Sequence, residues 1–130
     1  MTLLKVSALV VALLVPNLAA SGAMATSEHH HGAKHGGQFV ELKGHQGVEM
    51  VVKGNAITFF VTEEDKPAHL EGGSFRVVVQ AGSSVKMYPL KVDGSTLKVQ
   101  LDSVLPRGAK IVITGKDGHG HTLQARFVKN

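Results

Sequence analysis

The chain has 130 residues, no cysteine and a formal net charge of +4 at pH 7 with neutral histidines. This length suits one small domain, and the lack of cysteine excludes disulfides, thiolate nucleophiles and thiolate metal ligands. Positive charges are interspersed and aromatic residues make up only 5% of the chain, which argues against a nucleic-acid-binding protein.

Residues 1–25 have the three parts of a cleavable signal peptide. Lys5 is the only charged residue before Glu28, an apolar run follows it at 6–15, and the small-residue sequence Ala23-Met24-Ala25 ends the segment. The alternative is a retained membrane anchor, which is disfavoured because the apolar run is shorter than the ~20 residues of a membrane-spanning helix. We predict cleavage after Ala25, export to the periplasm and no membrane span in the mature chain.

A histidine- and glycine-rich segment follows the predicted cleavage site. Three glycines, Gly32, Gly36 and Gly37, disfavour regular structure, so residues 26–44 are predicted to form a flexible tail. Neutral imidazole is the commonest side-chain metal ligand and suits copper(II), zinc and nickel. A solvated tail that binds metal incidentally is the alternative. The candidate metal ligands in this tail are His29, His30, His31 and His35.

Residues 45–130 are predicted to form one all-β domain. Apolar and polar side chains alternate with a period of two, and turn signals such as Gly54-Asn55 separate the alternating runs. The expected strands are residues 48–53, 57–62, 75–81, 86–92, 96–101, 109–114 and 122–127. Pro89 marks the fourth as an edge or bulged strand. The pattern is typical of a small antiparallel β-sandwich, immunoglobulin-like, with about seven strands; a small open barrel is the alternative.

Three further histidines in turn regions are candidates to complete a metal site. His45 precedes the first expected strand. His119 and His121 flank Gly120 in the last turn, and residues two apart on an extended chain point to the same face. Solvated turn residues are the alternative for all three.

Catalysis is not expected. The serines lie in turns without a nucleophile motif, and the acidic run Glu63–Asp65 falls at a predicted hairpin end, where carboxylates are usually solvated. Met50 lies on the apolar phase of its strand, which favours a core position over a copper(I) ligand. We therefore predict that the protein is not an enzyme.

Several short motifs run through most of the mature chain. They are His31-Gly-Ala-Lys-His35-Gly-Gly37, Val48-Glu-Met-Val-Val-Lys53, Phe59-Phe-Val-Thr62 with Asp65-Lys-Pro67, and Asp117-Gly118 with Ala125-Arg-Phe127. In these motifs the chain resembles a family of small periplasmic proteins, mostly uncharacterised, that are associated with bacterial heavy-metal efflux and resistance loci. The resemblance implies an envelope location and a connection with metals. Among the candidate ligands, it implies a metal-binding role for the tail histidines only.

Together these features predict periplasmic binding or buffering of a divalent transition metal ion, with delivery to a component of an efflux system. The tail histidines would capture the ion, and His45, His119 or His121 would complete its site. The alternative function is an envelope protein-interaction module whose edge strands pair with a partner strand, with an incidental tail.

Overall fold

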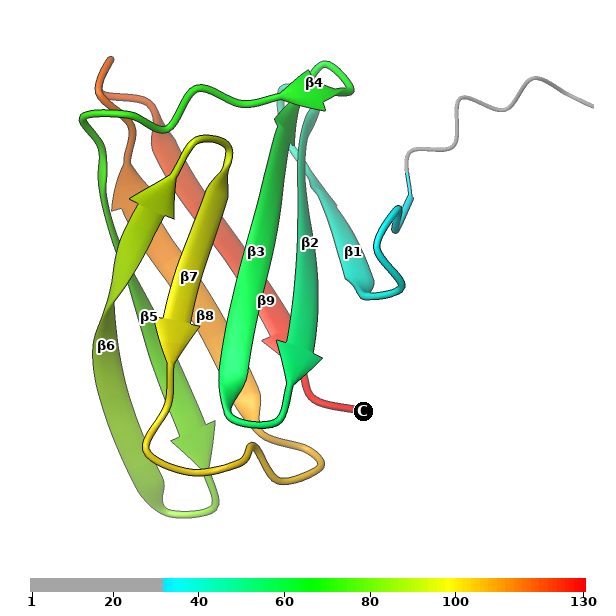
Figure 1. The fold of residues 1–130 in the computed structure, drawn as a ribbon, viewed down its shortest axis with the longest axis vertical. Helices are drawn as coiled ribbons and strands as arrows, with labels where there is room; N and C mark the ends of the chain where they lie inside the picture. The colour runs from blue at the N-terminus through cyan, green and yellow to red at the C-terminus, as the bar shows by residue number, and fades with distance from the viewer. Residues whose placement is uncertain (1–31) are drawn as a thin grey trace, which may run out of the picture.

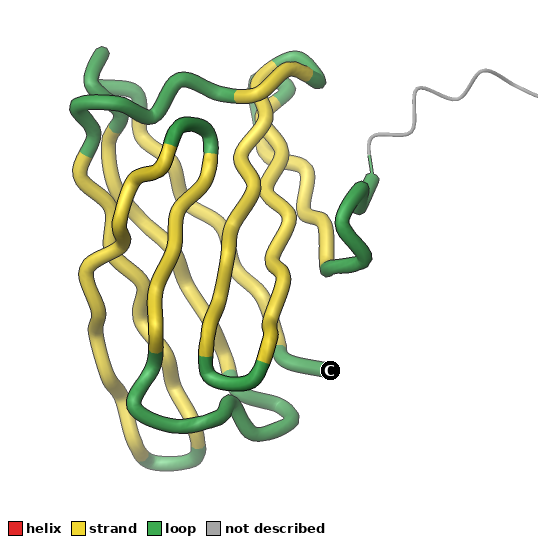
Figure 2. The backbone as a smooth tube through the Cα atoms, in the orientation of Figure 1, coloured by secondary structure: helices red, strands yellow, loops and turns green. Residues whose placement is uncertain are grey.

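The computed structural model describes residues 32–130. This part of the chain consists of strands and connecting loops (Figure 2), which confirms the all-β prediction. It holds no helix long and apolar enough to cross a membrane. The predicted signal peptide, residues 1–25, lies outside the described residues, together with its cleavage site.

The strands form one antiparallel sheet of nine strands in the order β1-β2-β3-β7-β6-β5-β8-β9, with β4 paired to β3. They are β1 (Gln38–Leu42), β2 (Gln46–Lys53), β3 (Ala56–Glu63), β4 (Lys66–Pro67), β5 (Ser74–Ala81), β6 (Ser84–Asp93), β7 (Thr96–Gln100), β8 (Lys110–Lys116) and β9 (Thr122–Val128). Seven of these correspond to the expected strands. The prediction of about seven omits β1 and the two-residue β4.

Strand β6 turns the sheet from one layer into the other. Its residues 84–90 pair with β5, whereas residues 91–93 pair with β7. In Figure 1, β8 and β9 therefore pass behind β3 and β7, and the sheet ends β1 and β9 contact each other, which gives a barrel-like shape. Among the described strands, the part of β6 that contains Pro89 pairs only with β5. This agrees with the edge strand that Pro89 predicts.

The apolar side chains of the period-two pattern fill the space between the layers. On β3, alternate residues Ile57, Phe59 and Val61 are buried, and the Phe59 ring lies 5.9 Å from that of Phe127 on β9. Met50 is also buried, so its predicted core position is confirmed. The largest fully buried side chains are Phe59, Met50, Ile57, Leu97, Ile111, Ile113, Val48 and Val77.

Strand β1 lies within the segment 26–44, for which the sequence predicts a flexible tail. Val40 and Leu42 pack against the core, and the register pairs Leu42 with Gln46 across a three-residue turn, 43–45. The glycines before β1 disfavour a helix but leave an extended strand possible. Pairing with β2 and apolar burial stabilise this short strand, and neither is visible in local composition.

Candidate functional site

A buried carboxylate on β2 organises the segment that leads into β1. Glu49 is 3% exposed and is the only polar or charged residue classed with the buried side chains of residues 32–130. Its cross-strand neighbours are Phe39 on β1 and Phe60 on β3. Because Val48 and Met50 on either side of it belong to the core, the Glu49 side chain lies on the outward face of the sheet, where residues 34–37 cover it.

The segment before β1 wraps its backbone around this carboxylate. The N–H groups of Lys34, His35 and Gly37 each donate a hydrogen bond of 2.8 Å to a carboxylate oxygen. Gly36 has φ of 76°, a conformation that turns successive N–H groups toward one anion. A side chain at Gly37 would clash with the carbonyl of Met50. Both glycines are thus needed for this loop to close on its anion.

These contacts also fix the charge of Glu49. Burial alone raises the pKa of the Glu49 carboxyl. Four hydrogen bonds outweigh burial and lower this pKa overall; their donors are the Gly37 N–H, the His35 ring and the N–H groups of Lys34 and His35. Glu49 is therefore ionised at neutral pH. Each hydrogen bond that it accepts is strengthened by its charge.

The imidazole of His35 is held on two sides. Its Nδ1 atom lies 2.9 Å from Oε1 of Glu49, and its ring stacks on Phe60 with centroids 3.6 Å apart and an interplanar angle of 6°. An ionised carboxylate only accepts hydrogen bonds, so Nδ1 carries the hydrogen. In the neutral ring the lone pair then lies on Nε2, and 46% of the side chain remains exposed.

This arrangement has the chemistry of an oriented metal ligand. Histidines that bind metals typically donate their other ring N–H to a carboxylate, which fixes the tautomer and makes the ligating nitrogen more basic. Stacking on Phe60 further restricts the ring, so less side-chain entropy is lost when an ion binds. In its neutral form, His35 can therefore offer Nε2 to a divalent ion.

A small cavity of about 30 Å³ lies beside the His35 ring. This volume accommodates about one water molecule. The cavity is lined by Gly32, Lys34, His35, Phe39, Glu49, Phe60, Thr62 and Asp65. Gly32 is the first described residue, so the chain enters the described structure at this cavity.

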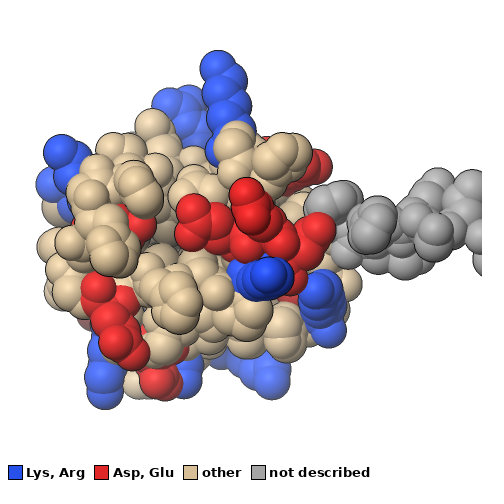
Figure 3. Space-filling model, turned by 90° about the horizontal axis from the view of Figure 1, so that it is seen from above, with Lys and Arg blue, Asp and Glu red and all other residues tan. Residues whose placement is uncertain are grey.

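The turn between β3 and β4 places negative charge at the same end of the molecule. Glu64 and Asp65 have φ of 50° and 64° and form a two-residue turn directly after Glu63. Figure 3 shows acidic side chains gathered on this end, viewed from above. The acidic turn therefore favours cations near the cavity that Asp65 lines.

Of the four tail histidines, His35 alone lies within the described residues. His29, His30 and His31 lie outside them. His45 occupies the β1–β2 turn with φ of 61°, and its carbonyl accepts a hydrogen bond of 2.9 Å from the Glu64 N–H. The backbone of His45 thus ties two turns together, while its side chain is exposed.

His119 and His121 belong to a separate carboxylate–histidine group in the β8–β9 turn. Oδ1 of Asp117 accepts the N–H groups of His119 at 2.9 Å and His121 at 2.8 Å, and Oδ2 lies 3.2 Å from Nδ1 of His121. Burial raises the pKa of Asp117, but these hydrogen bonds and the nearby histidines lower it overall. This turn lies on the far side of the molecule from residues 32–37 (Figure 1), so the structure does not bring the pair to His35.

Residues 32–130 contain no group of three His, Cys, Asp or Glu side chains placed to hold a metal ion.

The sequence patterns do not identify Glu49, the residue that orients His35. Glu49 alternates with the apolar residues of its strand, and this alternation predicts a side chain that faces solvent. Two signals could have identified it. The same phase carries Val51, and the facing residue on β3 is Phe60, so this outer face is too apolar to be fully solvated.

Comparisons with family models, with curated proteins and with solved structures gave no match. Function is therefore inferred from the chemistry of the chain itself.

Proposed function

We propose that this protein is exported to the periplasm, where it binds and buffers a divalent transition metal ion. The observation that carries the proposal is the pair formed by His35 and the buried Glu49, which leaves Nε2 of the neutral imidazole as the nitrogen that can bind a metal ion. Imidazole suits copper(II), zinc and nickel, and these are the proposed ions.

The remaining ligands of the proposed site come from the histidines that precede His35. His29, His30 and His31 directly precede Gly32, which lines the cavity beside His35 and Asp65. Consecutive Cα atoms are about 3.8 Å apart, so chain connectivity keeps His31 close to Gly32. Three or four imidazoles satisfy the coordination of zinc or copper(II), and the carboxylate of Asp65 adds favourable negative charge.

The other candidate histidines have different roles in this proposal. His45 contributes its backbone to a turn beside the acidic end. His119 and His121 supply two imidazoles and form at most a weaker, separate site. The tight site is therefore assigned to His29, His30, His31 and His35.

The wider setting of the proposal rests on the sequence. The signal-peptide pattern supports a periplasmic location, and the resemblance to proteins of metal-resistance loci supports delivery of the ion to a periplasmic component of an efflux system. We interpret the two layers of the sheet as an immunoglobulin-like sandwich, in which the candidate metal site lies on the outer face of β2 and β3 and is accessible to a partner.

Titration calorimetry on residues 26–130 with copper(II), zinc and nickel tests the proposal. One ion is expected to bind per chain with submicromolar affinity. His35→Ala and the triple variant His29→Ala/His30→Ala/His31→Ala should each lose most of this affinity. His69→Ala is the matched control, because His69 is an exposed histidine outside the proposed site and should bind as the wild type does.

Two results would contradict the proposal. One is wild-type binding no tighter than that of an unrelated peptide with the same number of histidines. The other is equal affinity in the wild type and in His35→Ala, because the oriented imidazole would then contribute nothing.

A further inference from the structure

The outward face of the layer formed by β6, β5, β8 and β9 carries exposed apolar side chains. Val85, Met87 and Val128 are 63%, 59% and 52% exposed, and they are three of the four large exposed hydrophobic residues in the described chain. The strand register places Met87 beside Val78, and Val78 beside Val112. A continuous apolar row therefore crosses three strands at the centre of this face.

Positive charge surrounds the apolar row on both sides. On β8, Lys110 lies two residues before Val112 and pairs with Val128 of β9. Arg126 of β9 pairs with Val112 and so lies at the end of the row. On the opposite side, Arg76 lies on β5 and Lys116 lies on β8. The paired segments 74–80, 85–89, 110–116 and 122–128 contain no Asp or Glu. All four cations are exposed, so this face has a single sign of charge.

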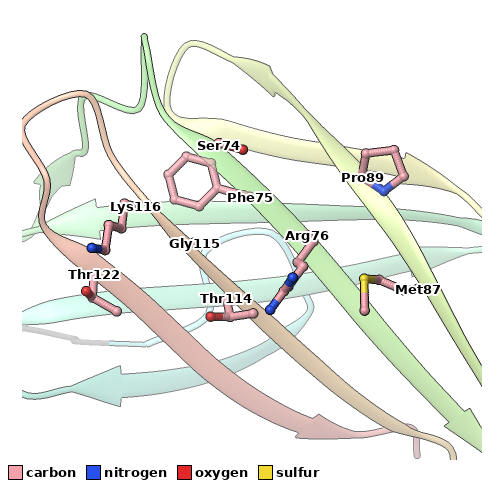
Figure 4. A pocket seen from close by; sticks show the side chains of 9 residues that line it. All are labelled: Ser74, Phe75, Arg76, Met87, Pro89, Thr114, Gly115, Lys116 and Thr122. Atoms are coloured by element: carbon pink, nitrogen blue, oxygen red, sulfur yellow. The ribbon is translucent and has the colours of Figure 1, made fainter.

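Two shallow hollows shape the same face. The larger, about 620 Å³, is shown in Figure 4, where Arg76 extends toward Thr114 while Met87 and Pro89 border it on β6. Lys116 borders its other side, across Gly115. The second, about 520 Å³, lies between Val85 and Val128. Each hollow combines apolar walls with cationic and polar groups at its rim, which suits a ligand with an anionic head and an apolar body.

We propose that this face docks on the surface of an anionic phospholipid bilayer. The cations lie on both sides of the apolar row, and a plane of negative charge complements them all at once. Met87, Val85 and Val128 would insert into the headgroup region, as the apolar face of an interfacial element does. The hydroxyl of Thr114 and the guanidinium of Arg76 would receive a lipid phosphate in the larger hollow.

This surface is independent of the proposed metal site. His35 and Glu49 belong to the outer face of β2 and β3, whereas the docking face belongs to the other layer. A bilayer bound to the docking face would leave the His35 ring accessible. Loss of metal binding would therefore not abolish docking, and the two proposals fail separately.

Co-sedimentation with vesicles tests the inference, using residues 26–130, which contain every strand that the structure describes, in metal-free buffer. The protein should bind vesicles made of equal parts phosphatidylcholine and phosphatidylglycerol, but not vesicles of phosphatidylcholine alone. Binding should weaken as salt is added, since salt screens exposed charges. Each Lys or Arg at an anionic surface contributes about fivefold to the partition coefficient, so Arg76→Gln/Lys110→Gln/Lys116→Gln/Arg126→Gln should abolish detectable binding.

A matched variant controls for net charge. Lys43→Gln/Lys53→Gln/Lys66→Gln/Arg107→Gln removes the same number of exposed cations from other surfaces and should retain most of the binding. Urea unfolding verifies that both variants are folded. A separate variant, Val85→Ser/Met87→Ser, should weaken binding while leaving its salt dependence unchanged.

Three results would overturn the inference. The first is equal wild-type binding to both kinds of vesicle, and the second is equal loss in the two charge variants. The third is a dimer in sedimentation equilibrium that Val85→Ser/Met87→Ser dissociates, without vesicle binding by the wild type, because a second copy of the chain would then cover this face.

Discussion

Two carboxylate–histidine pairs in this protein use the same chemistry over very different sequence distances. Glu49 and His35 are 14 residues apart, and the Glu49 side chain is only 4% exposed. Asp117 and His121 are four residues apart in one turn, and the Asp117 side chain is 13% exposed. The two histidine side chains are 46% exposed in the first pair and 64% exposed in the second. The first pair fastens the N-terminal segment to the sheet, whereas the second organises only its own turn.

The difference shows what burial adds to a common interaction. At Glu49, three backbone N–H groups and a ring nitrogen converge on one shielded anion, so the ring, the loop and the strand depend on one another. At Asp117, the two N–H donors belong to exposed residues of its own turn, so water can take the place of a lost acceptor. A ligand held in the first way is positioned before an ion arrives, and the following predictions test that distinction.

The largest expected effect is on stability. Glu49→Ala leaves several N–H groups without their acceptor and should lower the free energy of unfolding by about 3 kcal/mol. Asp117→Ala should cost clearly less, because its partners are exposed to water. Urea unfolding of both variants measures the difference, and equal losses would show that the Glu49 site is not special.

The loop glycines provide the next test. Gly37→Ala brings a methyl group against the Met50 carbonyl and should cost about 2 kcal/mol. In the other turn, a methyl group at Gly120 would face open space. Gly120→Ala should therefore lower the free energy of unfolding only through its positive φ of 85°, by about 1 kcal/mol. NMR should also show that Gly37→Ala moves the His35 ring off Phe60, with loss of the ring-current shift that stacking produces. An unchanged His35 shift would contradict the proposed role of this loop.

The orienting role of Glu49 is tested by metal affinity. A glutamine amide at position 49 can donate to Nδ1 of His35, which would permit the tautomer with hydrogen on Nε2. Glu49→Gln should therefore weaken zinc binding at least about tenfold, as changes to the partners of ligating histidines do. Calorimetry should find Asp117→Asn equal to the wild type; a similar loss in both variants would argue against a distinct site at His35.

The smallest expected effect is a pH dependence. The pKa of Glu49 is lower in the folded protein, so its contribution to stability is complete above its unfolded value, about 4.3, and is lost as the pH falls through the folded value. Unfolding free energies measured from neutral to acidic pH should therefore decline less steeply in Glu49→Gln than in the wild type. Parallel profiles would mean that this carboxyl is not preferentially ionised in the folded state.

Much of the fold can be predicted from local patterns, and less of the site can. Alternation such as Ile57, Phe59 and Val61 predicts strands because side-chain direction has a period of two, and Gly54-Asn55 predicts its hairpin. Strand β1 escapes prediction because its stability comes from pairing with β2. His35 is predictable as a ligand candidate from histidine clustering. The burial of Glu49 is not, because a segment more than ten residues away creates it.

The central claim is that Glu49 holds His35 with Nε2 ready to bind a metal ion, and long-range ¹H–¹⁵N NMR of the histidine rings tests it most directly. Without metal, and at a pH high enough for the histidine rings to be neutral, the spectrum should show His35 with hydrogen on Nδ1 and a lone pair on Nε2. One equivalent of zinc should shift the Nε2 resonance of His35 and leave His119 and His121 unchanged. Hydrogen on Nε2 without metal, or a zinc response confined to His119 and His121, would contradict the account.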